Sequence, residues 1–221
     1  MFFNLEVNLN TNKLLILGDS YSTFKGYIPE GYSFYYDDKE SRGLDVRHVE
    51  ETWWHKLLTA TNAQLALNNS WSGSTICYTA YDKRDCSHDS SFIYRFRELI
   101  KNGFFEKSDV DTVILFGGTN DSWAGSPLGE IKLSDFEESD LYYAIPAVCY
   151  LIKLVRETLP EANILFVINT KIKPEIVDAI KMASEHFGID CMQLQNIDKK
   201  NGHPTVKGMD DIYNEILAFL K

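Results

Sequence analysis

The sequence predicts an α/β sandwich built around a mostly parallel sheet. Several apolar runs have the length of a strand and are nearly continuous, as is typical of parallel strands that helices cover on both faces. Elsewhere, apolar residues recur at three- and four-residue steps, which is the pattern of one buried helix face. Strands that alternate with helices along a chain indicate an α/β fold.

The elements follow one another without a linker, an internal repeat or a low-complexity segment. The predicted strands are KLLIL (13–17), QLAL (64–67), DTVILFG (111–117), NILFVIN (163–169) and IDCMQL (189–194). Helices are predicted at TWWHKLL (52–58), over 140–159 and over 205–220. With 221 residues, of which 44% are hydrophobic and 24% charged, the chain can bury one sizeable core. We therefore expect residues 1–221 to form a single domain.

The charge balance argues against some kinds of partner. The chain has 22 Lys and Arg against 32 Asp and Glu, which gives a net charge of −10, and it has no block of basic residues. Binding to the backbone of DNA or RNA needs clustered basic side chains, and so does docking on anionic lipid. We expect neither partner.

The sequence also lacks the features of membrane insertion and of export. No apolar run approaches the roughly 18 residues of a membrane span, so we expect no membrane insertion. The first residues, MFFNLEVNLNTNK, lack the basic start and long apolar core of a secretory signal. We expect a cytoplasmic protein if Met1 is the native start, and a secreted or periplasmic one if a signal peptide has been removed. The sequence predicts no oligomeric state.

The candidate catalytic residues lie in four polar loops that follow strands or precede a helix. Ligands of parallel sheets bind beyond the carboxyl ends of the strands, so a site is expected among these loops. Ser20 follows the first strand in GDSYSTF, Gly73 follows the second in NNSWSGST, and Asn120 follows the third in GGTND. His203 lies just before the last helix. Acyl transfer needs this set of a nucleophile, a base and oxyanion donors, so Ser20 is the predicted nucleophile. Taken singly, each residue could instead be a turn, capping or surface residue.

These blocks, in this order from Gly18 to Gly208, resemble the GDSL/SGNH hydrolases. The resemblance implies a three-layer, flavodoxin-like fold with a five-stranded parallel sheet. It also implies hydrolysis of carboxylic esters without a metal or an organic cofactor. Ser20 would attack the acyl carbonyl and His203 would take its proton. The backbone N–H groups of Ser20 and Gly73 and the side-chain amide of Asn120 would hold the oxyanion.

The chain departs from the family at the acid that orients the histidine. That acid usually lies three residues before the histidine, where this chain has Lys200, which cannot accept a hydrogen bond from an imidazole. The nearest upstream carboxylate is Asp198, and an Asn201-Gly202 turn could absorb the extra residues. We expect Asp198 to orient His203. The alternative is a Ser–His dyad in which a backbone carbonyl orients the ring.

The expected substrate is a small-molecule ester with a short acyl group, such as an acetyl ester on a carbohydrate. Trp71 and Trp123 lie in the loops of Gly73 and Asn120, and we expect them to line the substrate pocket. Alternatives are lysophospholipase or thioesterase activity on longer chains, acyl transfer to an alcohol, and a binding module that has lost turnover. The other histidines show no spacing that would suggest a metal site.

Overall fold

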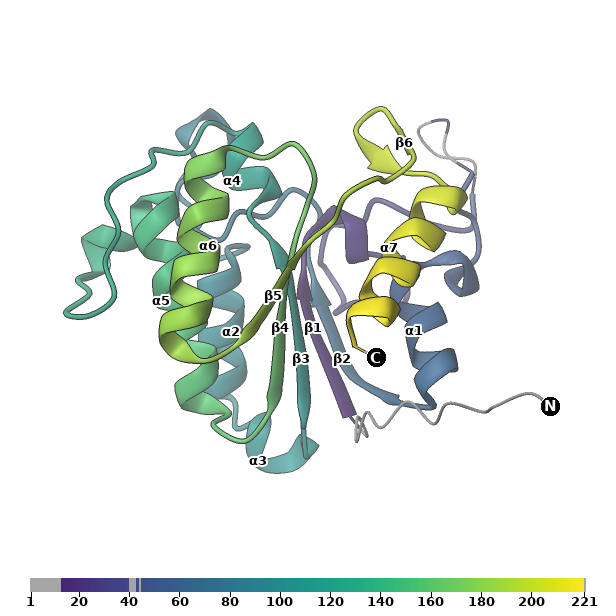
Figure 1. The fold of residues 1–221 in the computed structure, drawn as a ribbon, viewed down its shortest axis with the longest axis horizontal. Helices are drawn as coiled ribbons and strands as arrows, with labels where there is room; N and C mark the ends of the chain where they lie inside the picture. The colour runs from purple at the N-terminus through teal and green to yellow at the C-terminus, as the bar shows by residue number, and fades with distance from the viewer. Residues whose placement is uncertain (1–12, 40–42, 44, 221) are drawn as a thin grey trace.

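A five-stranded parallel sheet forms the middle layer of the computed structural model, which describes residues 13–39, 43 and 45–220 (Figure 1). The strand order is β2-β1-β3-β4-β5. The strands are β1 Lys13–Gly18, β2 Gln64–Ser70, β3 Thr112–Gly117, β4 Asn163–Ile168 and β5 Asp190–Gln193. The predicted α/β class and each predicted strand are confirmed; β2 extends three residues beyond its predicted end, and the other strand ends agree within one residue.

Helices cover both faces of this sheet, and short 3₁₀ turns lie in several connections (Figure 1). The α-helices are α1 Trp53–Thr61, α2 Phe92–Lys101, α3 Phe105–Ser108, α4 Thr119–Trp123, α5 Ala144–Thr158, α6 Pro174–Phe187 and α7 Val206–Phe219. The 3₁₀ turns are η1 Ser20–Ser22, η2 Val49–Glu51, η3 Tyr81–Lys83 and η4 Glu138–Tyr142. Helices α1 and α7 pack on one face, and α2, α5 and α6 pack on the other.

The two cores explain why the strands are apolar at nearly every position. In β1, Leu15 and Leu17 point into the core under α2, α5 and α6, whereas Leu14 and Ile16 point into the core under α1 and α7. Successive side chains of a strand face opposite sides, so a sheet covered twice needs apolar residues throughout. The sheet is thus buried on both faces between the helical layers.

One predicted helix differs from the structure. Residues 140–159 were expected to form a single helix, but the chain forms η4 up to Tyr142 and begins α5 only at Ala144. Tyr143 between them has extended backbone angles, with φ −109° and ψ 135°. Pro146 explains the late start, because proline lacks the backbone N–H that a helix interior needs and is tolerated only in the first turn.

A small antiparallel hairpin, β6 Lys199–Lys200 and β7 His203–Pro204, lies above the beginning of α7 in the view of Figure 1. Asn201 and Gly202 form its turn with positive φ values of 52° and 80°. Such angles are typical of a two-residue hairpin turn and suit an Asn-Gly pair. Thr205 then caps α7, because its Oγ1 accepts the N–H of Gly208 at 3.1 Å. None of the described helices is long and apolar enough to span a membrane.

Candidate active site

The turn after β1 places Ser20 at the carboxyl end of the sheet. Asp19 caps the 3₁₀ turn η1, because its Oδ1 accepts the N–H of Tyr21 at 3.0 Å. Gly18 makes the tight exit possible, since a Cβ there would lie only 2.6 Å from Oγ of Ser70. Only 4% of Ser20 is exposed. The GDS sequence therefore forms a compact corner that holds a hydroxyl just beyond the strand end.

The side chain of His203 contacts that of Ser20, although the two residues lie near opposite ends of the chain. Its Nε2 lies 2.9 Å from Oγ of Ser20, although 183 residues separate them in sequence. Its Nδ1 lies 3.2 Å from the backbone carbonyl oxygen of Asn201. When Nδ1–H donates to this carbonyl, Nε2 is left as the unprotonated acceptor that a general base needs. The imidazole thus connects the alcohol to the turn of its own hairpin.

Asp198 does not reach His203, contrary to the expectation from sequence. Its carboxylate accepts the hydroxyl of Thr205 instead, and its carbonyl accepts the N–H of Thr205 at 3.2 Å. The hairpin register explains this, since Lys200 pairs with His203 and places Asp198 beside Thr205. The Asn201-Gly202 turn forms as expected, but it closes a ladder rather than looping out. The carbonyl of Asn201 occupies the position that the dyad alternative requires.

Two tyrosine hydroxyls attach the hairpin to the loops after β1. The hydroxyl of Tyr21 donates to the carbonyl of Gly202, and that of Tyr36 donates to the carbonyl of Pro204 at 2.9 Å. These bonds flank His203 on both sides along the chain. The position of the imidazole is therefore fixed through its own backbone.

Lys199 attaches the other strand of the hairpin to the end of β4. Its Nζ donates to Oδ1 of Asn169 at 2.8 Å and to Oγ1 of Thr170 at 2.6 Å. Asn169 in turn donates to Oγ1 of Thr119, the residue before Asn120, at 3.1 Å. Burial, with a smaller effect of Lys171, lowers the pKa of Lys199 to about 8. A polar chain thus joins the hairpin of His203 to the beginning of α4.

The predicted oxyanion donors come from the loops after β2 and β3. Gly73 has a φ of 82°, and Asn120 lies in the first turn of α4. The Asn120 side chain joins the two loops, because its Nδ2 donates to the carbonyl of Ser74 at 3.0 Å. A side-chain amide has two N–H donors, so one is left for a ligand. Among the described residues, the backbone N–H groups of Ser20 and Gly73 have no hydrogen-bond acceptor, which leaves both available to an anion.

Two further residues fix this amide and its loop. The hydroxyl of Tyr81 donates to Oδ1 of Asn120 at 2.9 Å, which sets the direction of the amide. The buried carboxylate of Asp121 accepts the N–H groups of Ile76 and Cys77 at 2.9 and 3.0 Å. Burial raises the pKa of Asp121 above its ordinary value, while these backbone bonds oppose the shift. The segment after Gly73 is therefore held onto α4.

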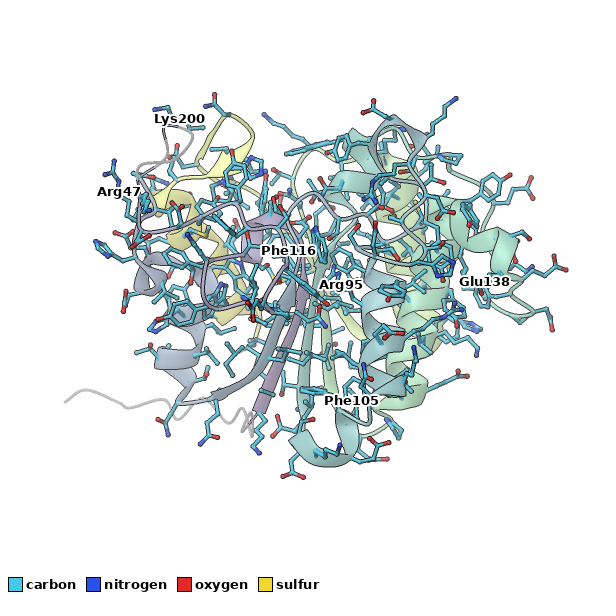
Figure 2. The ribbon with its side chains drawn as sticks, turned by 180° about the vertical axis from the view of Figure 1, so that it is seen from behind. Arg47, Arg95, Phe105, Phe116, Glu138 and Lys200 are labelled. Atoms are coloured by element: carbon cyan, nitrogen blue, oxygen red, sulfur yellow. The ribbon has the colours of Figure 1, made fainter. Side chains whose placement is uncertain are left out.

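Arg95 of α2 is a buried residue that the sequence analysis did not single out (Figure 2). Its Nη2 donates to the carbonyl of Gly18 and to Oγ of Ser74, both at 3.1 Å. Its Nη1 contacts Asn69 and its Nε donates to the carbonyl of Ser90 at 3.0 Å. Burial lowers the pKa of this guanidinium to about 10. Arg95 thus connects Gly18, the first residue of the GDS corner, to the loop of Gly73.

Asp19 carries the strongest perturbation next to the candidate nucleophile. Burial raises its pKa to about 7, although its bond from the Tyr21 N–H acts in the opposite direction. Its Oδ2 is buried without a hydrogen-bond partner among the described residues. This carboxyl is therefore a structural cap whose charge is costly where it lies.

Aromatic rings surround the imidazole and the loops beside it. Tyr35 stacks on His203 with ring centroids 3.5 Å apart and an interplanar angle of 6°. Trp123 is 41% exposed and meets His203 edge-on, with centroids 6.1 Å apart. Trp71 packs against Tyr32 with centroids 4.4 Å apart and an interplanar angle of 43°. Of the two tryptophans predicted to line the site, Trp123 lies beside the imidazole and Trp71 packs on a neighbouring loop.

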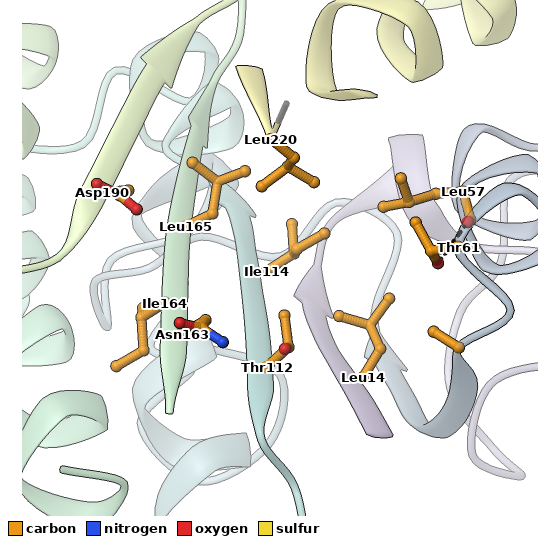
Figure 3. A pocket seen from close by; sticks show the side chains of 11 residues that line it. Leu14, Leu57, Thr61, Thr112, Ile114, Asn163, Ile164, Leu165, Asp190 and Leu220 are labelled. Atoms are coloured by element: carbon orange, nitrogen blue, oxygen red, sulfur yellow. Dashed lines mark hydrogen bonds between the residues drawn. The ribbon is translucent and has the colours of Figure 1, made fainter. Parts of the chain in front are cut away.

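An apolar cavity of about 40 Å³ lies at the opposite edge of the sheet (Figure 3). It is lined by the first residues of β3, β4 and β5, which are Thr112, Asn163 and Asp190, and by Leu57 and Leu220 among others. A cavity of this size holds a few water molecules at most. The cavity is thus separate from the corner of Ser20. Within the described part of the chain, no three His, Cys, Asp or Glu side chains gather as a metal site would require.

An α/β sandwich with an alcohol, an imidazole and amide donors at one sheet edge is characteristic of the carboxylic ester hydrolases. The chain belongs to the GDSL-like lipase/acylhydrolase family, whose model matches residues 12–220. The family resemblance predicted from the sequence is thereby confirmed, and the protein is a carboxylic ester hydrolase.

Solved structures agree with this family. A protein from Bacteroides ovatus ATCC 8483, provisionally named a GDSL-like lipase, is 41% identical with a TM-score of 0.88, covering 95% of this chain and 98% of its own. One of the same description from Bacteroides uniformis ATCC 8492 is 39% identical with a TM-score of 0.87, covering 95% of each chain. An acetyl xylan esterase from Butyrivibrio proteoclasticus is 17% identical with a TM-score of 0.60, covering 95% of this chain and 63% of its own. That last likeness shows the shared fold. The curated proteins contain no match to this chain.

Proposed function

We propose that this hydrolase uses Ser20 as its nucleophile and His203 as its general base, with the carbonyl of Asn201 orienting the imidazole at Nδ1. The observation that carries the proposal is the 2.9 Å contact between Ser20 Oγ and His203 Nε2. A candidate base must lie within about 2.6–3.2 Å of the proton that it abstracts. The carbonyl of Asn201 at 3.2 Å from Nδ1 supports the orientation of the ring.

The reaction follows from these positions. His203 Nε2 takes the proton of Ser20 as Oγ forms a bond to the acyl carbonyl carbon. The carbonyl oxygen becomes an oxyanion, which the N–H groups of Ser20, Gly73 and the Asn120 side chain stabilise. Collapse breaks the ester C–O bond, and the leaving alcohol takes the proton back from Nε2. Water then attacks the acyl-enzyme with the same base, which releases the acid and regenerates the serine.

The proposed substrate is an ester of a short acyl group, with acetyl esters of carbohydrates as the favoured class. The 4% exposure of Ser20 supports a small acyl group, because little of this residue is accessible from solvent. The exposed indole of Trp123 beside His203 offers a flat face on which a sugar ring can stack. One protein with the same fold is named as an acetyl xylan esterase, which agrees with this choice.

Ser20→Ala tests the proposal. We expect the variant to lose at least about a thousandfold in kcat on p-nitrophenyl acetate, because no other group can form the acyl-enzyme. Ser22→Ala is the matched control, since Ser22 lies in the same 3₁₀ turn and its Oγ has no partner among the described residues. Equal rates for Ser20→Ala and the wild-type enzyme would refute the nucleophile.

The same assay tests the substrate class when the acyl chain and the alcohol are varied. We expect kcat/KM to fall from acetyl to butyryl to octanoyl esters, and acetate to be released from acetylated xylo-oligosaccharides. A preference for octanoyl esters would favour the long-chain alternative. Transfer of acetyl to an added sugar instead of water would identify an acyltransferase.

A further inference from the structure

The imidazole of His203 is held across its face as well as at its edge. Tyr35 covers one face of the ring at a centroid separation of 3.5 Å and an angle of 6°. Tyr21 and Trp123 approach at steeper angles of 52° and 74°. Tyr35 is thus the one ring of the three that lies parallel to the imidazole.

Tyr35 is also fixed to the nucleophile by its backbone. Its N–H donates to Oγ1 of Thr23 at 2.9 Å, and the same hydroxyl donates to the carbonyl of Ser20 at 3.1 Å. A single threonine hydroxyl therefore sets the position of the Tyr35 backbone relative to Ser20. The Tyr35 ring and the Ser20 hydroxyl both contact the imidazole, and Thr23 keeps them in a fixed position relative to each other.

Resting on the proposed function, we propose that Tyr35 is a positioning residue whose ring face stabilises the imidazolium form of His203. When the base takes the proton of Ser20, its ring becomes a cation. A cation is attracted to the face of an aromatic ring within about 6 Å of its centroid. Tyr35 covers the face of the imidazole at a centroid separation of 3.5 Å, well inside this range, so its ring can stabilise the cation from a direction that a hydrogen bond at Nδ1 does not use.

The stacked ring also restricts the rotation of the imidazole. The hydrogen bonds at Nδ1 and Nε2 act at the edge of the ring and oppose a tilt of its plane only weakly. A parallel ring at van der Waals distance prevents the tilt and keeps Nε2 directed at the Oγ of Ser20. Tyr35 therefore acts on the chemical step and not on the binding of the ester.

Substitutions that keep or remove the ring face test the inference. We expect Tyr35→Phe to keep kcat on p-nitrophenyl acetate within about twofold, because it retains the aromatic face. We expect Tyr35→Leu and Tyr35→Met to lower kcat about tenfold with KM changed less than about twofold. Tyr27→Leu, the same change at an exposed tyrosine, is the control.

A spectroscopic readout reports the stacking independently of activity. The ring protons of His203, identified by comparison with His203→Gln in histidine-labelled protein, should be shifted upfield by the ring current of the phenol. The shift should persist in Tyr35→Phe and disappear in Tyr35→Leu and Tyr35→Met. Ring protons that do not move in either aliphatic variant would show that the rings are not stacked.

The outcomes separate this inference from the proposed function. If Ser20→Ala retains the wild-type rate, the proposed function fails and this inference falls with it. If Ser20→Ala is inactive but Tyr35→Leu keeps full kcat, only the role of Tyr35 is overturned. If Tyr35→Phe is as impaired as Tyr35→Leu, the hydroxyl matters rather than the ring face, which also overturns it.

Discussion

Asp19 and Ser20 are adjacent in the chain, but only the side chain of Ser20 has the partner that its chemistry requires. The hydroxyl of Ser20 needs a base beside it, and His203 lies 2.9 Å away. The carboxyl of Asp19 needs solvent or a cation, and it has neither in hydrogen-bond contact, since one of its oxygens is buried without a partner among the described residues. The corner that holds the nucleophile is therefore built at a cost in stability.

Asp19→Asn should remove this cost. The pKa of Asp19 in the folded protein is about 7, above its ordinary value of 3.8, so the folded state binds the proton more tightly than the unfolded state does. The stability linked to that proton is fully present below about pH 4 and is lost as the pH rises through about 7. We expect the free energy of unfolding of Asp19→Asn, relative to wild type, to increase by a few kcal/mol over this range.

Urea unfolding at unit steps from pH 4 to pH 8 measures this difference. The asparagine keeps a side-chain oxygen for the Tyr21 N–H, so the cap itself is retained. Asp178→Asn, the same substitution at an exposed position of α6, controls for the change in charge. A difference that is the same at every pH would mean that Asp19 is ionised throughout and that its burial is offset in another way.

At the scale of single residues, position relative to the strands decided what the sequence could predict. Ser20, Asn120 and His203 were found because each lies next to an apolar run or a helix start, and parallel strands bring such corners to one edge. The sequence contains a signal for Arg95, because it is a charged residue on the apolar face of the helical segment FIYRFRELI. No sequence pattern points to Tyr35, because it lies in a long irregular loop without periodicity.

At the scale of elements, the β6–β7 hairpin determines how the base is oriented. The sequence identified the Asn-Gly turn and the departure from the family at Lys200. It could not fix the register, because a turn that loops out and a turn that closes a ladder use the same residue types. In the structure the hairpin pairs Lys200 with His203. This register places Asp198 beside Thr205, and the Asp198 carboxylate accepts the Thr205 hydroxyl.

Asp198→Asn separates a triad from a dyad. In a triad, replacing the orienting acid by its amide lowers kcat about ten-thousandfold. We expect less than about a threefold change here, because the Asp198 carboxylate contacts Thr205 and the Asn201 carbonyl contacts the ring. The measurement is kcat on p-nitrophenyl acetate, with Asp211→Asn, a change at a neighbouring carboxylate of α7, as the control. A loss approaching that of Ser20→Ala would restore Asp198 to the mechanism.

At the scale of the whole molecule, one sheet connects two apolar cores and the site at its carboxyl edge. Ser20 and Asn120 follow strands of that sheet, and His203 precedes the helix α7 that packs on one face of it. The apolar runs predicted the sheet because a strand covered on both faces leaves a continuous pattern. The helices α2 and α6 were not predicted individually, although the α/β class implied helices on both faces.

The prediction of a single domain can be tested through the two cores. Leu15 and Ile16 are adjacent in β1 and fully buried, one in each core. Replacing either by alanine should lower the free energy of unfolding by about 2–5 kcal/mol. Because both cores are built on the same strands, we expect each variant to unfold in one transition, with the whole chain losing stability together.

Tryptophan fluorescence makes this test specific to one core. Trp53 and Trp54 lie in the core under α1 and α7, and replacing Trp71 and Trp123 by phenylalanine leaves them as the only tryptophans, since the chain has 4. In that background Leu15→Ala removes methyl groups from the opposite core. We expect the urea midpoint by fluorescence to fall as far as the midpoint by far-ultraviolet circular dichroism. The contrary outcome is a fluorescence midpoint that stays at the parent value while the dichroism midpoint falls. It would mean that the two faces unfold as separate units, because a loss of packing in one core would then leave the stability of the other core unchanged.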